Sequence, residues 1–138
     1  MFVVIVGSRE WKSEQSKMQV HKILEELRKK YSGMVIVSSS CDMGVGAIVK
    51  EQCLKDKKTF QFIDIHMRVF ADLPRTKLSQ AFYARNAALA ELGEEFHVCV
   101  DKDRRGAFED LIERLERMEM KRPLMIHLPE EGANGLES

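Results

Sequence analysis

Phe2-Val3-Val4-Ile5-Val6, followed by Gly7-Ser8-Arg9, is the stretch that decides the fold. A continuous apolar, β-branched run that ends in Gly-Ser is typical of a strand buried on both faces and leading into a tight turn. From residue 14 to residue 31 the apolar residues change to helical spacing, with charged residues between them. The first 31 residues therefore predict a strand, a turn and a helix.

The same alternation of strand and helix patterns continues to the end of the chain. Further strands are predicted at 34–37, 59–65, 96–100 and 124–128, and further helices at 45–55, 78–92 and 108–118. Strands that alternate with helices indicate βαβ units, so we expect a Rossmann-like three-layer α/β/α domain with a mainly parallel five-stranded sheet. We assign residues 1–129 to this domain and expect residues 130–138, which are polar, to form a disordered tail.

Charge and composition narrow the class of protein. The chain has 138 residues, which suits one domain, and its 22 Lys and Arg residues balance 22 Asp and Glu residues. A net charge of zero argues against a protein whose main role is to bind nucleic acid, because such proteins usually carry an excess of basic residues. The same neutrality does not oppose self-association, so we expect a homodimer or a higher homo-oligomer.

Cysteine usage and hydropathy suggest a reduced, cytoplasmic protein. The three cysteines form no CxxC motif and no Cys/His pairing, so neither a disulfide framework nor a metal site is expected, and no cofactor is predicted. No apolar run reaches 18 residues and no basic segment leads a signal sequence, so no membrane partner is expected.

Several chemically useful side chains follow the first strand. In parallel α/β sheets, ligands bind at the carboxyl ends of the strands. There Gly7 permits a sharp turn, Ser8 offers a hydroxyl, and Arg9 offers a planar set of donors suited to phosphate or carboxylate. Trp11 is expected to stack on a base or ring. The alternative is an ordinary strand exit in which Trp11 covers the core.

The loop after the second strand predicts an anion site at the start of a helix. Gly44 and Gly46 stand at that start, where free N–H groups and the helix dipole favour an anion, and Ser40 lies just before them. Asp42 is the best-placed candidate for catalysis, although capping the helix is the role that its position favours more. Neither a GxGxxG fingerprint nor a Walker loop is present. Cys41 is expected to pack rather than to react.

An arginine interrupts the apolar stripe of the helix at 78–92. Arg85 falls in line with Ala81, Phe82 and Leu89, and a buried arginine needs a partner. That partner is an acidic side chain such as Asp42 or Asp101, or a bound anion, unless the arginine reaches out to solvent. Asn86 beside it is suited to bind a carbonyl, a ribose or a base edge.

The four histidines suggest no catalytic group. His21, His66, His97 and His127 are scattered, and none pairs with a cysteine or a carboxylate at catalytic or metal-ligand spacing, so no triad is predicted.

Gly7-Ser8-Arg9, the small-residue loop after the second strand and Arg85-Asn86 together resemble the SLOG superfamily. That Rossmann-like group includes the DprA proteins, the LOG phosphoribohydrolases and the YspA-like proteins of the DUF2493 type. The resemblance covers roughly residues 2–116. The family usually carries paired glycines where this chain has Ser39-Ser40, and the Pro-Gly-Gly-x-Gly-Thr loop of the LOG enzymes, with its catalytic glutamate, is missing.

The resemblance implies binding or sensing of a nucleotide or a nucleotide-derived small molecule. The first alternative is a phosphoribohydrolase-like N-glycosidase, with Asp42 as the catalytic carboxylate and Glu91 as a distant second. The second alternative is DprA-like binding of single-stranded DNA, which the zero net charge and the single Trp argue against.

Overall fold

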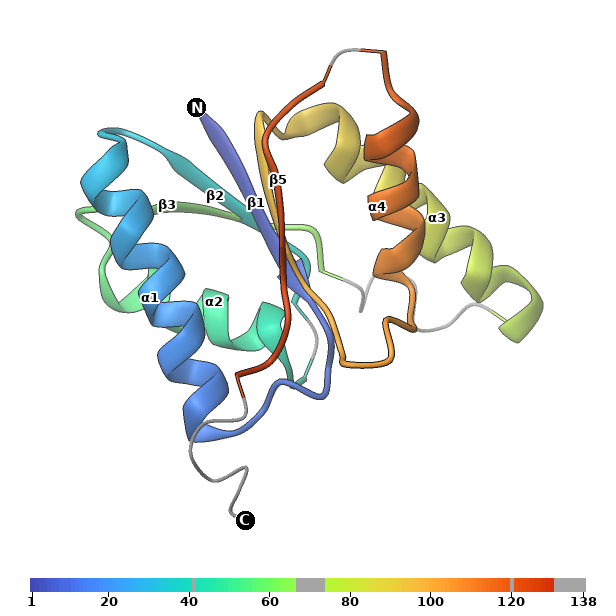
Figure 1. The fold of residues 1–138 in the computed structure, drawn as a ribbon, viewed down its shortest axis with the longest axis horizontal. Coiled ribbons are helices and arrows are strands. Elements are labelled where there is room, and N and C mark those ends of the chain that lie inside the picture. The colour runs from blue at the N-terminus through green and yellow to red at the C-terminus, as the bar shows by residue number, and fades with distance from the viewer. Residues whose placement is uncertain (41, 67–73, 120, 131–138) are drawn as a thin grey trace.

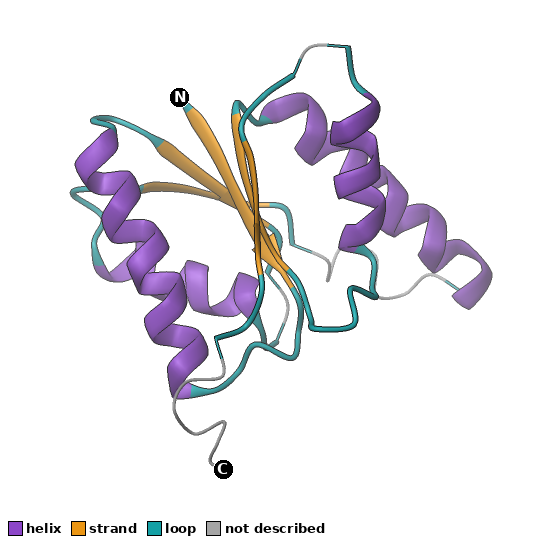
Figure 2. Cartoon of the chain, viewed as in Figure 1, coloured by secondary structure: helices purple, strands orange, loops and turns teal. Residues whose placement is uncertain are grey.

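The computed structural model describes residues 1–40, 42–66, 74–119 and 121–130. Strands and helices alternate along the chain (Figures 1 and 2). The elements are β1 (Phe2–Gly7), α1 (Glu14–Lys30), β2 (Val35–Ser38), α2 (Val45–Lys55), β3 (Gln61–Asp64), α3 (Arg75–Leu92), β4 (Glu95–Cys99), α4 (Phe108–Arg117) and β5 (Leu124–His127). Among the helices of these ranges, none is long and apolar enough to cross a bilayer.

The five strands form one sheet in the order β3-β2-β1-β4-β5, and every pair is parallel. The predicted Rossmann-like architecture is therefore confirmed, with a sheet that is wholly rather than mainly parallel. The chain builds outward from β1 to β3 and then crosses back to place β4 on the other side of β1. The strand order thus reverses between β1 and β4, which is where ligands bind in sheets of this kind.

Helices cover both faces of the sheet. Figure 1 shows α1 and α2 on one face and α3 and α4 on the other. Alternate residues of β1 enter two separate cores, with Val3 and Ile5 on the α1/α2 side and Val4 and Val6 on the α3/α4 side. All four side chains are fully buried, which explains why β1 is apolar at every position rather than at every second one.

Element boundaries differ from the prediction mainly at β3 and α3. β3 is confined to Gln61–Asp64 because only those residues pair with β2. α3 begins at Arg75, three residues before its first apolar position, because Pro74 serves as its N-cap. Pro fits the start of a helix, where its missing N–H has no intrahelical role. Of the expected tail at 130–138, Glu130 is described and its N–H donates to the Gln19 side chain. Cys41 and residues 131–138 lie outside the described residues.

Candidate functional site

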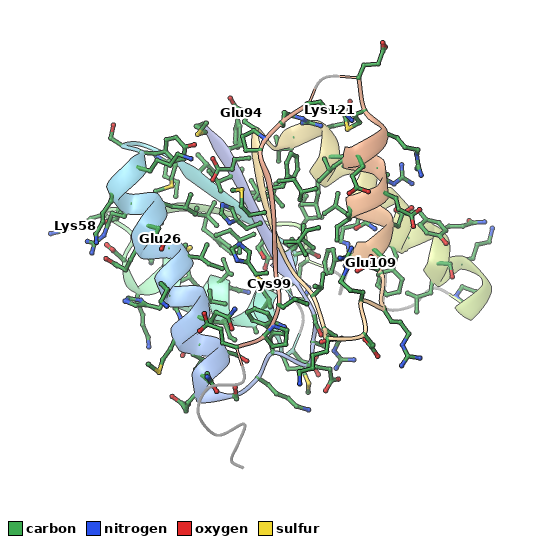
Figure 3. All side chains as sticks on the ribbon, viewed as in Figure 1. Glu26, Lys58, Glu94, Cys99, Glu109 and Lys121 are labelled. Atoms are coloured by element: carbon green, nitrogen blue, oxygen red, sulfur yellow. The ribbon has the colours of Figure 1, made fainter. Side chains whose placement is uncertain are left out.

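An open cavity of about 680 Å³ lies at the carboxyl ends of β1 and β4, where the strand order reverses. Figure 3 labels two residues that line it, Cys99 on the sheet and Glu109 near the start of α4. The full lining is Gly7, Ser8, Arg9, Glu10, Ser39, Asp42, Gly46, His66, Leu78, Phe82, Arg85, Cys99, Val100, Asp101, Arg105, Gly106, Ala107, Phe108 and Glu109.

One side of the cavity is built from backbone where the turn after β1 meets the start of α2. Ser8 N–H donates to the Cys99 carbonyl at 3.0 Å, and the Val45 N–H of α2 donates to the Ser8 carbonyl at 3.1 Å. Gly44 is the N-cap of α2 with φ 94°, and Gly46 stands in the first turn and lines the cavity. First-turn N–H groups have no partner within a helix, so this end of α2 is suited to an anion.

Asp42 does not cap α2, so that prediction is wrong. Gly44 occupies the N-cap position, and no side chain accepts a hydrogen bond there. Asp42 instead accepts a hydrogen bond from Arg9 at 3.0 Å, and both side chains are mostly exposed at the cavity rim. Arg9 and Asp42 form a weak surface ion pair beside the cavity. An incoming anion would compete with Asp42 for Arg9.

Ser39 lines the cavity, but its hydroxyl oxygen is itself buried. Its side chain is 6% exposed, and its Oγ has no hydrogen-bond partner among the described residues. A buried hydroxyl without a partner is unfavourable, and a rotation of the side chain would be needed to bring this oxygen to a ligand. Ser40 next to it turns away, because its N–H and its hydroxyl both bond to Asp64 at 2.9 and 2.5 Å. Ser40 thus anchors the loop after β2 to Asp64 of β3 and does not line the cavity.

The opposite side of the cavity is apolar and aromatic, and Arg85 lies within it. Leu78, Phe82 and Phe108 supply the apolar surface. Arg85 is 5% exposed, as its place on the stripe of α3 predicts, and its guanidinium lies 4.0 Å from the ring centre of Phe108 and 5.2 Å from that of Phe82. The cation–π contacts favour the charged group at an otherwise apolar wall. Arg85 also donates to Asn86 Oδ1 at 3.2 Å.

Five predicted site residues lie outside the cavity lining: Trp11, Ser40, Gly44, Asn86 and Glu91. Trp11 is 2% exposed, belongs to the core and donates its indole N–H to the Val100 carbonyl, so its ring is not available for stacking. Asn86 is fully buried, and its amide already bonds Ala107 and Asp110 besides Arg85. Its predicted ligand contact is therefore wrong.

Glu91, the weaker catalytic candidate, lines a separate shallow groove between α3 and α4 together with Ala87 and Arg114. It does not share a cavity with Asp42, so the two carboxylates do not form a catalytic pair. Gly7, Ser8, Arg9, Asp42, Gly46 and Arg85 are the predicted residues that the fold brings together.

Cys99 lines the cavity but is not suited to nucleophilic attack. Its side chain is fully buried, and burial raises the pKa of the thiol well above its usual range. The reactive thiolate is therefore disfavoured. In the ranges the structure describes, no three His, Cys, Asp or Glu side chains are grouped to hold a metal ion.

A buried polar network on the α1 face of the sheet is missing from the sequence predictions. His97 Nε2 bonds Glu95 at 2.8 Å and His97 Nδ1 bonds His127 at 2.9 Å, while Tyr31 donates to Glu95. The sequence predictions concern histidine pairs only at catalytic and metal-ligand spacings, so they do not include this structural pair. The signal is the Glu-x-His spacing within a buried strand, which places both side chains on one face. Burial lowers the pKa of His97 and brings that of His127 to about 4.

This network makes the fold sensitive to acid. Both histidines have a lower pKa in the folded chain than their usual 6.5, so below pH 6.5 the unfolded chain binds protons that the folded chain does not. The free energy of unfolding that the neutral histidines contribute above pH 6.5 is lost as the pH falls toward 4. We expect a loss on the order of 2 kcal/mol between pH 7 and pH 5, measured by urea denaturation. His127→Gln should flatten this slope.

The control is His21→Gln, since His21 is 64% exposed on α1. It should leave the pH dependence as in the wild type. A wild-type stability that does not change between pH 7 and pH 5 would show that these histidines are not held neutral by the fold.

Fold and site together define a class: a doubly wound parallel α/β domain with an open cavity at its switch point, polar on the α2 side and aromatic on the α3/α4 side. Comparison with protein-family models, with curated proteins and with solved structures returns no match.

Proposed function

We propose that this protein binds a nucleotide or a nucleotide-derived small molecule in the cavity between β1 and β4, and that it acts as a binding or sensing module. The phosphate end of the ligand lies at the start of α2, near Arg9 and Gly46, and the base lies against Phe82 and Phe108. The proposal needs no chemical step and assigns no cofactor.

The observation that carries the proposal is a cavity at the switch point of the sheet whose polar side holds Arg9 and the first turn of α2. A guanidinium and helix N–H groups are donors that phosphate prefers. Two phenylalanines line the other side, and a base offers a flat apolar surface to such a wall. An amphipathic ligand with one anionic end fits both sides at once.

The resemblance to the SLOG superfamily supports the same proposal from the sequence. Gly7-Ser8-Arg9 and Arg85, on which the resemblance depends, both line the cavity. We therefore propose that the chain belongs to this superfamily, with Gly44 and Gly46 in place of the paired glycines usual at Ser39-Ser40.

Isothermal titration against AMP, ADP, ADP-ribose and the unphosphorylated nucleoside tests the proposal. We expect the phosphorylated compounds to bind and the nucleoside to bind far more weakly. Arg9→Ala should weaken binding about tenfold, because a charge-assisted hydrogen bond contributes roughly 1.5 kcal/mol. Asp42→Asn should strengthen binding, because it removes a carboxylate that competes with phosphate for Arg9.

Glu91→Gln is the matched control, since it removes a carboxylate on α3 that lies outside the cavity. Its affinity should equal that of the wild type. Failure of every phosphorylated compound to bind, or affinity unchanged by Arg9→Ala, would contradict the proposal.

Asp42→Asn also separates the hydrolase alternative from simple binding, because Asp42 is the predicted catalytic carboxylate and lines the cavity. A phosphoribohydrolase-like enzyme would release base from nucleoside monophosphates and lose this activity in Asp42→Asn. A binding module would release no base, and the variant would bind more tightly.

A further inference from the structure

Asp101 is an acidic residue of the cavity lining whose carboxylate has no partner in the described part of the chain. It lies just beyond the end of β4 and is half-buried. Its backbone carbonyl accepts a hydrogen bond from the Arg104 N–H at 3.0 Å, but within the described ranges no ion pair or hydrogen bond reaches its side-chain oxygens. The pairing of Asp101 with Arg85 that the sequence left open is therefore not formed.

The other acidic residues of the lining each lie beside a basic side chain. The pairs are Asp42 with Arg9 at 3.0 Å, Glu109 with Arg104 at 2.7 Å, and Glu10 with Lys12 at 3.7 Å. An ionised carboxylate accepts hydrogen bonds through two oxygens and donates none. Among the described acidic residues of the lining, Asp101 thus keeps its full accepting capacity for a ligand.

The loop that Asp101 begins connects the polar side of the cavity to its aromatic side. Ser8 N–H donates to the Cys99 carbonyl at 3.0 Å, so β1 and β4 end side by side. The turn after β1 carries Arg9, while the loop after β4 carries Asp101 and then continues to Phe108 on the aromatic wall. Asp101 thus starts beside the turn that carries the guanidinium and precedes the ring in the same loop.

The sugar of a nucleotide lies between its phosphate and its base. With the phosphate near Arg9 and the base against Phe108, as in the proposed function on which this inference rests, the sugar comes beside Asp101. A carboxylate repels phosphate, but its two oxygens match the two donors of a vicinal diol. An acidic side chain that follows a strand holds ribose hydroxyls in this way in dinucleotide-binding α/β folds.

We infer that Asp101 accepts hydrogen bonds from the 2′- and 3′-hydroxyls of the ligand, and that the cavity selects ribonucleotides over deoxyribonucleotides. Asp101 is then a specificity-determining residue and takes part in no chemical step. Arg9 supplies affinity for the phosphate of either kind of nucleotide, whereas Asp101 distinguishes the two kinds by their sugar.

Isothermal titration with ADP, 2′-deoxy-ADP and 3′-deoxy-ADP tests the inference. Wild type should bind ADP about tenfold or more tightly than either deoxy compound, because each of these lacks a hydroxyl that donates to a charged acceptor. Asp101→Ala should bind ADP and 2′-deoxy-ADP with equal affinity, because the group that distinguishes them is gone. The comparison of ligands on the wild type needs no variant, so the test does not depend on how well Asp101→Ala folds.

Asp103→Ala is the matched control. Asp103 lies in the same loop, but it bonds Arg105 at 2.9 Å and does not line the cavity. This variant should keep the wild-type preference for ADP over 2′-deoxy-ADP. Equal binding of ADP and 2′-deoxy-ADP by the wild type, or a preference that survives in Asp101→Ala, would overturn the inference and leave the proposed function standing. Failure of every phosphorylated compound to bind would overturn both.

Discussion

Gly44→Ala is expected to cost about 3 kcal/mol or more of stability and to weaken ligand binding at least tenfold. Gly44 has φ 94° and ψ −164°, a conformation that residues with a side chain rarely adopt. An added Cβ would lie 2.4 Å from Arg9 Cα and 2.5 Å from the Ser8 carbonyl oxygen. Both obstacles are backbone, so the turn after β1 must separate from the start of α2. Urea denaturation and isothermal titration with ADP-ribose measure the two effects.

Gly33→Ala is the control for backbone strain alone. Gly33 also has a positive φ, 68°, but an added Cβ would meet nothing within 4 Å. This variant should lose about 1 kcal/mol and keep the wild-type affinity. Equal losses of stability in the two variants would mean that strain, rather than the close approach of the turn after β1 to α2, determines the cost at Gly44.

Arg85→Leu is expected to preserve the fold and to weaken binding of phosphorylated ligands about 10- to 100-fold. Leucine retains apolar contact with Phe82 and Phe108 but removes an arginine that α3 contributes to the cavity lining. Loss of a charge-assisted hydrogen bond in a partly buried site costs roughly 1.5 to 3 kcal/mol. The affinity of the wild type should fall with added salt, and that of the variant should fall less.

Arg122→Leu is the matched control, because Arg122 also lies over a phenylalanine, 4.9 Å from the Phe96 ring centre, but does not line the cavity. It should lose stability, since its guanidinium bonds the Ala90 and Gly93 carbonyls, and keep the wild-type affinity. If Arg85→Leu binds as wild type does, Arg85 serves the packing of α3 on α4 rather than the ligand.

The strand–helix order and the position of the site could be predicted because both follow from local pattern. β1 is apolar throughout, as a strand between two helical layers must be, and parallel strands bring their carboxyl ends to one edge. Arg9, Gly46 and Arg85 meet in one cavity for that reason. Arg85 was recognisable because a charge on an apolar stripe is unusual.

The errors concern side chains whose direction depends on neighbours distant in sequence. Trp11 could face a ligand or the core. It faces the core, where its indole N–H donates to the carbonyl of Val100, which is 89 residues away in sequence. Asp42 could cap α2 or bond an arginine. It accepts a hydrogen bond from Arg9, which lies on another loop. Local sequence leaves both outcomes open, because each hydrogen bond is made to a group that only the folded sheet brings near.

The sequence by itself determined the order of elements, the parallel architecture and the edge of the sheet that carries the stretch Gly7-Ser8-Arg9. Periodicity and strand polarity are local properties, and they suffice for these features. Only the tertiary structure decided which side chains of that edge are available to a ligand. In the fold, Trp11 packs into the core and Asn86 bonds toward α4, while Arg9 and Arg85 line the cavity. The partner of a buried polar group is the group that lies near it in space, and the pattern of residues along the sequence does not specify which group that is.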